Sequence, residues 1–160
     1  MTEDEKNMKK VFIKMQYKGD EEIVVLSHPD EFKNHIEEIS SSAQIYFDYK
    51  KIKSDKKFGF ILIFVKSCAE VEKFAQLIKN NLTDDGNFWF AYPKKTSKKY
   101  TADISRDNGW QPLGDLGFEA VRGIAIDDDW SALRFRLVRN IRNLKRDKSR
   151  IMSNEGRTKK

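Results

Sequence analysis

The sequence predicts an α/β domain, three-layered and Rossmann-like, whose mostly parallel sheet ends in an antiparallel C-terminal hairpin. Continuous apolar runs at residues 22–27, 58–65 and 87–92 are typical of strands buried on both faces. Segments with apolar residues at helical spacing alternate with these runs. Two further strand-like segments, joined by a short polar link, close the pattern. Helical connections between strands imply right-handed parallel pairing and a sheet covered on both faces.

The first half of the chain contains two expected strands with a helix between them. The strands are residues 22–27 (EIVVLS) and 44–49 (QIYFDY). Pro29 and Asp30 open a helix that runs to residue 39, with Phe32, Ile36 and Ile39 on one apolar stripe. Before them, residues 18–20 predict a turn, and residues 11–17 fit either an alternating strand or the end of an N-terminal helix.

The second half contains the strand expected at the centre of the sheet, residues 58–65 (FGFILIFV). A helix at 68–82 and a connection ending at 84–86 lead to a strand at 87–92. Residues 102–116 predict a second crossover helix, irregular because Gly109, Pro112 and Gly114 lie inside it. Strands at 119–126 and 131–138 form the hairpin, and Leu137, Ile141 and Leu144 suggest a last helix that leads into the tail.

Composition places the chain among small soluble proteins. Its 160 residues suit one compact domain, and 39% apolar residues suffice for a core. No apolar run approaches the roughly 20 residues of a membrane helix, and the first ten residues lack the apolar region of a secretory signal. The single cysteine, Cys68, excludes an internal disulfide and a multi-cysteine zinc site. We therefore expect a cytoplasmic protein that does not bind a membrane.

The positive charge is concentrated at the C-terminus. Residues 134–160 hold eleven Lys and Arg against two acids, a net charge of +9, which leaves −3 for the preceding 133 residues. We therefore divide the chain into a domain at 1–138 and a basic helix or tail at 139–160. Its basic residues include Arg139, Arg142, Lys145 and Arg146. Such a run is either a solvated end or a weak, salt-sensitive contact with nucleic acid.

Two motifs give the sequence a family resemblance. They are WFAYPK at 89–94, and AID at 125–127 followed by WSALRFR at 130–136. Residues 18–136 resemble a family of bacterial proteins called domain of unknown function 3052. The resemblance implies a small cytoplasmic α/β domain of bacterial origin, and it implies no activity.

The predicted order of elements also resembles the methyltransferase version of the Rossmann architecture, which ends in a similar hairpin. A methyltransferase would place a glycine-rich turn after its first strand, where backbone approaches the cofactor. Here residues 26–30 read LSHPD, without glycine, and Asp48 is the nearest candidate for an acid that binds a ribose. We therefore expect no S-adenosylmethionine, no other cofactor and no catalytic residues.

Ligands of open α/β sheets bind at the carboxyl ends of the parallel strands. Residues expected at this edge are His28, Lys66, Ser67, Tyr92, Lys94 and Lys95, with Asp103, Arg106 and Asp107 at the start of the next helix. As candidate ligand-binding residues we single out Lys66, Tyr92, Lys94, Asp103, Arg106 and Asp107. The basic side chains suit a phosphate or carboxylate. The alternative is that Arg106 pairs with a neighbouring acid and the lysines are solvated.

Other chemistry-bearing residues have simpler interpretations. Asp103 and Asp107, four apart on the expected helix, either divide acid and base roles, bind a hard cation, or stabilise the helix N-terminus. His28 and His35 are too far apart for a metal pair on one short helix, so we expect no metal site. Cys68 opens a helix, whose dipole lowers a thiol pKa, but it has no catalytic partner.

Trp130 closes the polar link of the expected hairpin. It either stacks on a base or a partner's ring, or covers the sheet edge with its indole N–H bonded to a carboxylate. In the second interpretation Asp127 and Ser131 bond the backbone of the turn.

Three functions remain open. The first is a non-catalytic binding or regulatory domain, with a protein partner that the sequence does not identify. The second is a nucleic-acid- or ribosome-associated accessory protein that acts through its basic tail. The third is a small-molecule binding protein or enzyme that uses the strand-end edge.

Overall fold

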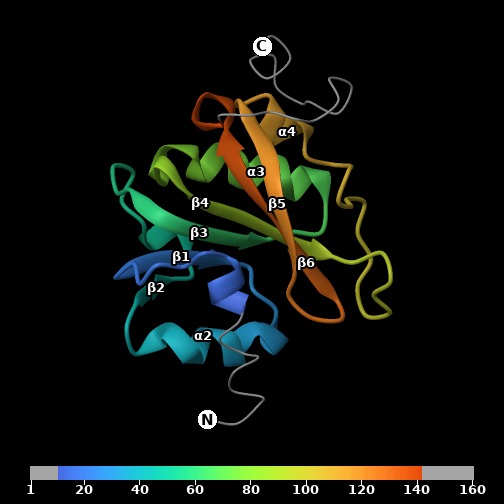
Figure 1. Ribbon diagram of the computed structural model, residues 1–160, viewed down its shortest axis with the longest axis horizontal. Coiled ribbons are helices and arrows are strands. Elements are labelled where there is room, and N and C mark those ends of the chain that lie inside the picture. The colour runs from blue at the N-terminus through green and yellow to red at the C-terminus, as the bar shows by residue number, and fades with distance from the viewer. Residues whose placement is uncertain (1–10, 142–160) are drawn as a thin grey trace.

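A computed structural model describes residues 11–141 of the chain. Its centre is a six-stranded sheet in the order β2-β1-β3-β4-β6-β5 (Figure 1). The strands are β1 (Glu22–Leu26), β2 (Gln44–Tyr46), β3 (Phe58–Phe64), β4 (Leu82–Pro93), β5 (Phe118–Ala125) and β6 (Trp130–Leu137). Pairing is parallel from β2 to β4 and antiparallel from β4 through β6 to β5, which confirms the predicted class and its terminal hairpin.

Helices cover both faces of the sheet and make three layers. One face carries α3 (Cys68–Ile78) and α4 (Gln111–Gly114), and the other carries α2 (Lys33–Ser40) with the helical segment at residues 11–14 (Figure 1). A separate hydrophobic cluster lies under each layer. Phe32, Ile36 and Ile39 are buried as their spacing predicts, and the ambiguous segment before the first strand is helical.

The predicted central strand lies in the interior of the sheet. β3 pairs with β1 on one side and β4 on the other, and residues 60–65 are almost completely buried. The helix that follows begins as a capped helix should, because the Ser67 hydroxyl accepts a hydrogen bond from the backbone N–H of Glu70. It ends at Ile78 rather than at residue 82, and residues 84–86 belong to β4. The second strand is also shorter than expected and ends at Tyr46.

The predicted second crossover helix is wrong. Of residues 102–116 only Gln111–Gly114 are helical, and the preceding stretch is irregular, with an isolated bridge between Ser105 and Asn108. This connection does cross the sheet, because β4 and β5 both pair antiparallel with β6 and therefore run parallel to each other, but it crosses with only one short helix. Gly109 has a φ of +102°, a conformation that a right-handed helix excludes.

The hairpin matches its predicted position to within one residue. The Asp127 carboxylate accepts hydrogen bonds from the N–H groups of Asp129 and Trp130, as predicted for a turn residue. After β6 a short 3-10 turn, η4 (Val138–Asn140), ends the described part of the chain. Residues 137–141, where the predicted last helix begins, form the end of β6 and this short turn, and the rest of that helix and of the tail, from residue 142 on, lies outside the described residues. Within residues 11–141 no helix is long and apolar enough to cross a membrane.

Gly109→Ala tests the bend that replaces the predicted helix. A Cβ on Gly109 would lie 2.1 Å from Cγ2 of Ile104, a side chain that is itself buried. We expect a loss of about 2–4 kcal/mol in the free energy of unfolding, measured by urea denaturation. Gly19→Ala is the control, since Gly19 has a φ of +86° but open space around it, and should cost about 1 kcal/mol. Equal losses for both variants would contradict the packing argument.

Candidate functional site

The sheet order reverses between β1 and β3, because the chain leaves β1 for β2 on one side and then returns to β3 on the other. A cleft of about 430 Å³ lies outside the carboxyl ends of these two strands, which we call the switch-point cleft. It is lined by Ser27, His28, Pro29, Asp30, Glu31, Lys66, Lys99, Tyr100 and Trp130. Clefts at this place are the usual ligand sites of open α/β sheets.

Glu31 is the central acceptor of the switch-point cleft. Its Oε1 accepts a hydrogen bond from the Tyr100 hydroxyl at 2.6 Å and one from the Trp130 indole N–H at 3.2 Å, and Lys99 Nζ lies 3.5 Å from Oε2. Burial opposes the charge on this carboxyl, but the hydrogen bonds from Tyr100, from its own backbone N–H and from Trp130, together with the charge of Lys99, outweigh it and lower the pKa of Glu31. Glu31 therefore stays ionised and joins three segments that are far apart in sequence.

Trp130 covers the sheet edge, which is one of the two roles that the sequence left open. Its side chain is 2% exposed, packs against Phe64 and Tyr100, and donates to a carboxylate. The covering interpretation is confirmed, and the indole presents no free face for stacking on a base. Lys66 lies in the same cleft, with its Nζ 4.9 Å from the centre of the Tyr100 ring.

A second cleft of about 330 Å³, the Tyr92 cleft, lies at the carboxyl end of β4. It is lined by Tyr92, Lys94, Lys95, Thr96, Ser105, Arg106, Asp107 and Ser131. Tyr92 is 6% exposed and its hydroxyl is hydrogen-bonded to Ser131. Burial raises the pKa of Tyr92, so its hydroxyl remains protonated at neutral pH. The cleft therefore combines neutral hydroxyl groups with three basic side chains and one acidic side chain.

The structure brings four of the six candidate ligand-binding residues together: Tyr92, Lys94, Arg106 and Asp107 all line the Tyr92 cleft. Lys66 lies in the switch-point cleft instead. Asp103 does not start a helix of its own; its carboxylate accepts a hydrogen bond from the backbone N–H of Cys68, at the N-terminus of α3. The shared helix face proposed for Asp103 and Asp107 does not exist, because that segment is irregular.

The switch-point cleft is completed by residues that the sequence did not indicate. Glu31 resembled an ordinary acid in the first turn of a helix, and Lys99 and Tyr100 lay in a polar stretch without a motif. The one available signal was that Tyr100 is an aromatic residue in an otherwise polar connection. Their meeting depends on contacts between positions 69 and 99 residues apart.

The remaining candidate residues, the two histidines and the cysteine, lie against neighbouring side chains. The His28 ring packs on Phe47, with ring centres 5.3 Å apart, and burial with the nearby Lys33 lowers the pKa of His28. Burial and the neighbouring Asp103 raise the pKa of the Cys68 thiol, the opposite of activation by a helix dipole. His35 packs against Phe32. Within residues 11–141 no three potential metal ligands converge.

The basic tail is only partly described. Arg139 forms an ion pair with Asp84, Nη2 to Oδ1 at 2.9 Å, so its charge is already matched. Arg142, Lys145 and Arg146 lie outside the described residues. The tail hypothesis therefore stays a prediction.

Comparisons with solved structures identify the architecture. An S-adenosylmethionine-dependent methyltransferase from Clostridium acetobutylicum ATCC 824 superimposes with a TM-score of 0.50 at 9% identity, covering 83% of this chain and 90% of that one. The glycopeptide N-methyltransferase MtfA gives 0.50 at 9% identity over 85% and 94% of the two chains. Phosphoethanolamine N-methyltransferase 2 of Haemonchus contortus gives 0.52 at 12% identity, over 81% of this chain and 37% of that one.

No family model and no curated protein matches the sequence. Identities near 10% establish a shared fold and not a shared activity. The chain therefore has the Rossmann-like fold of the methyltransferases.

Glu31→Gln tests the hydrogen-bonded centre of the switch-point cleft. A neutral amide accepts more weakly than a carboxylate, so we expect a loss of about 1–3 kcal/mol in unfolding free energy at pH 7. Because the folded pKa is lower than the unfolded one, this contribution is complete above about pH 4.5 and disappears as pH falls through the folded pKa. The two proteins should therefore converge in acid. Asp30→Asn, at a 97% exposed side chain, is the control and should change stability by less than about 0.5 kcal/mol.

Proposed function

We propose that this protein is a non-catalytic binding or regulatory domain that holds a small anionic ligand, with a phosphate or carboxylate group, in the Tyr92 cleft. The observation that supports this most is the charge balance of that cleft. Lys94, Lys95 and Arg106 converge there, and among the described residues none of the three forms an ion pair with a carboxylate. Asp107 is the single acid of the lining.

The hydroxyl groups of the cleft orient the anion that these basic side chains attract. Tyr92 and Ser131 lie on the neighbouring strands β4 and β6 and face each other in register. Thr96 and Ser105 add two more hydroxyl groups from the segments that close the cleft. Arginine and lysine supply charge-assisted hydrogen bonds to anionic oxygens, and hydroxyl donors fix the orientation of the anion.

S-adenosylmethionine, which the fold suggests, does not fit the residues present. The turn after β1 contains Ser27, with a φ of +62°, followed by His28 and Pro29, so side chains stand where a glycine-rich backbone would approach the cofactor. The His28 ring on Phe47 links the turn after β1 to the segment after β2. Asp48, the nearest candidate for a ribose contact, already accepts a hydrogen bond from the N–H of Lys50. We therefore derive no methyl transfer.

Titration with inorganic pyrophosphate and with citrate at low salt tests the anion site. We expect backbone amide signals of residues 92, 94–96 and 105–107 to shift in NMR spectra, with a Kd that rises at higher ionic strength. Arg106→Gln should weaken binding at least tenfold, because it removes one charge-assisted contact of about 1.5–3 kcal/mol. Lys50→Gln, an exposed lysine on the short turn after β2, is the control and should leave the Kd unchanged. Equal weakening by both variants would mean that the anion responds only to the overall charge of the protein and would contradict the proposed site.

Isothermal titration with S-adenosylmethionine tests the other half of the proposal. We expect no heat of binding at ligand concentrations up to about 1 mM, which would correspond to less than about 4 kcal/mol of binding energy. A micromolar Kd would overturn the non-catalytic assignment. In that case His28→Gly, which restores glycine to the turn, should tighten binding further.

A further inference from the structure

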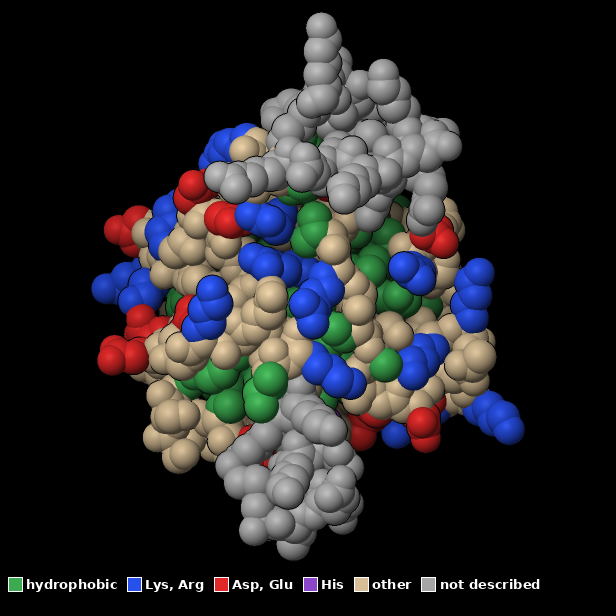
Figure 2. All heavy atoms as spheres, viewed as in Figure 1, with side chains coloured by type: hydrophobic (Ala, Val, Ile, Leu, Met, Phe, Trp, Pro, Cys, Tyr) green, Lys and Arg blue, Asp and Glu red, His purple; other side chains and the backbone are tan. Residues whose placement is uncertain are grey.

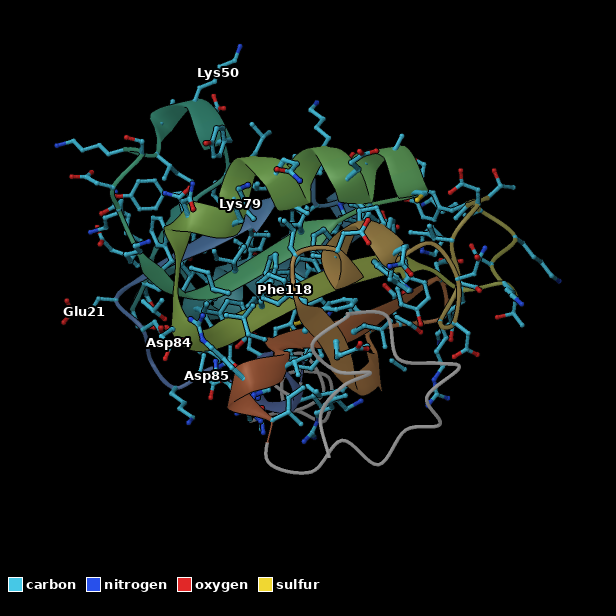
Figure 3. The ribbon with its side chains drawn as sticks, turned by 90° about the horizontal axis from the view of Figure 1, so that it is seen from above. Glu21, Lys50, Lys79, Asp84, Asp85 and Phe118 are labelled. Atoms are coloured by element: carbon cyan, nitrogen blue, oxygen red, sulfur yellow. The ribbon has the colours of Figure 1, made fainter. Side chains whose placement is uncertain are left out.

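A third cavity, of about 410 Å³, lies at the opposite end of the sheet from both clefts, and we call it the amino-edge pocket. It is lined by Gln16, Lys18, Asp20, Gly59, Thr83, Asp85, Gly86, Asn87, Arg134 and Arg136. Gly59, Thr83 and Gly86 lie where β3 and β4 begin, and the two arginines lie towards the end of antiparallel β6. Figure 3 shows Asp84 and Asp85 at the end of the sheet where Glu21 precedes β1.

The two arginines follow the alternation of β6. Trp130 and Ala132 face the cluster under α2 and the N-terminal helical segment, so Arg134 and Arg136 continue the same face of the strand. In the register of the sheet Arg134 stands opposite Trp89 on one side and Arg122 on the other. Figure 2 shows basic side chains gathered across the face that carries β5 and β6.

Arg134 and Arg136 differ in what neutralises them. Arg136 forms a two-pronged ion pair with Asp85, with both N–O distances 2.7 Å. Arg134 donates from Nη1 to the side-chain oxygen of Gln16, a neutral amide, and its buried Nε has no partner among the described residues. Burial and the neighbouring Arg136 and Arg122 lower the pKa of Arg134, and the attraction of Asp85 offsets them only in part. A half-buried guanidinium without a carboxylate is costly unless an anion joins it.

Asn87 supplies the second unmatched group. The residue is 9% exposed, and its Nδ2 donates to the backbone carbonyl of Gln16 at 3.0 Å. A carbonyl can only accept, so this contact fixes the orientation of the amide. The Oδ1 of Asn87 is buried without a partner in the described part of the chain. One pocket thus contains an uncompensated donor and an uncompensated acceptor.

The residues that hold these groups have unusual backbone conformations. Gln16 has a φ of +60° and Asp85 a φ of +55°, and they are two of three non-glycine residues with positive φ in residues 11–141. Each such residue costs about 1 kcal/mol or more. Gln16 contacts both Arg134 and Asn87, and Asp85 binds Arg136, so both strained residues serve this pocket. Strain of this kind is concentrated at functional sites.

We propose that the amino-edge pocket is a second binding site, for a small carboxylic acid that carries a hydroxyl or amino group next to its carboxylate. The carboxylate accepts hydrogen bonds from the guanidinium of Arg134, and the adjacent hydroxyl or amino group donates to Oδ1 of Asn87. The lining holds three basic and two acidic residues, so a hydroxy acid with one negative charge makes it neutral, whereas a zwitterionic amino acid leaves one positive charge. This inference is independent of the proposed anion site at the other edge.

Titration of the full chain with lactate, alanine, acetate and inorganic phosphate tests the site, followed by the backbone amide signals of residues 85–87 and 134–136. We expect lactate or alanine to bind about tenfold tighter than acetate, because only they bring a donor for Asn87. The comparison of lactate with alanine identifies the hydroxyl or the amino form. Phosphate binding tighter than every carboxylate, or no shift with any probe, would overturn the proposal.

Variants separate binding from folding. Arg134→Gln should weaken lactate and alanine at least tenfold, and Arg134→Lys, which keeps the charge, should retain part of the affinity. Arg122→Gln removes a neighbouring exposed charge outside the lining and should change the Kd less than twofold. Asn87→Ala should abolish the advantage of lactate over acetate while acetate binds as before. The dispersion of amide signals in each variant's NMR spectrum verifies that it is folded, and equal weakening by Arg122→Gln would refute the site.

Discussion

The burial of β1, β3 and β4 on both faces is the constraint on which the rest of this structure depends. Along β1, β3 and residues 88–92 of β4 almost every side chain is apolar and inaccessible, and each face carries its own hydrophobic cluster. A polar group in their interior would lose its hydration without compensation. Charged and hydrogen-bonding residues are therefore displaced to the strand ends. All three cavities described above lie at those two edges.

Acidic side chains at the edges hold the connecting segments in place. Glu31 joins the helical entry after β1 to Tyr100 and to the hairpin, Asp103 caps α3 from 35 residues away, and Asp85 fixes Arg136. In each case the carboxylate is bonded by N–H or O–H donors of a distant segment. Charge-assisted hydrogen bonds of this type are stronger than neutral ones. Two of them, at Glu31 and Asp103, hold the mostly irregular connection between β4 and β5, in which only Gln111–Gly114 are helical.

The two edges have different chemistry. At the carboxyl edge the switch-point cleft lies where open α/β sheets usually bind ligands, and the turn after β1 carries the side chains of Ser27, His28 and Pro29 instead of glycines. Its basic residues converge beside β4 instead, in the Tyr92 cleft. The amino edge contains a guanidinium and an amide oxygen that the rest of the described chain leaves unmatched. A protein with this fold can thus bind ligands at either edge, since the fold fixes the scaffold and not the chemistry.

The sequence by itself determined the parallel core, the central strand at 58–65, the capped helix after it and the terminal hairpin. Those elements depend on local spacing of apolar residues and on turn chemistry, which are readable along the chain. It also placed Tyr92, Lys94, Arg106 and Asp107 at one edge, because they follow a buried strand. Only the tertiary structure decided the rest: that residues 102–110 bend instead of forming a helix, that Glu31 meets Trp130, and that Arg134 faces Gln16 instead of a carboxylate. The last two outcomes depend on contacts between residues 99 and 118 positions apart, which no local pattern encodes.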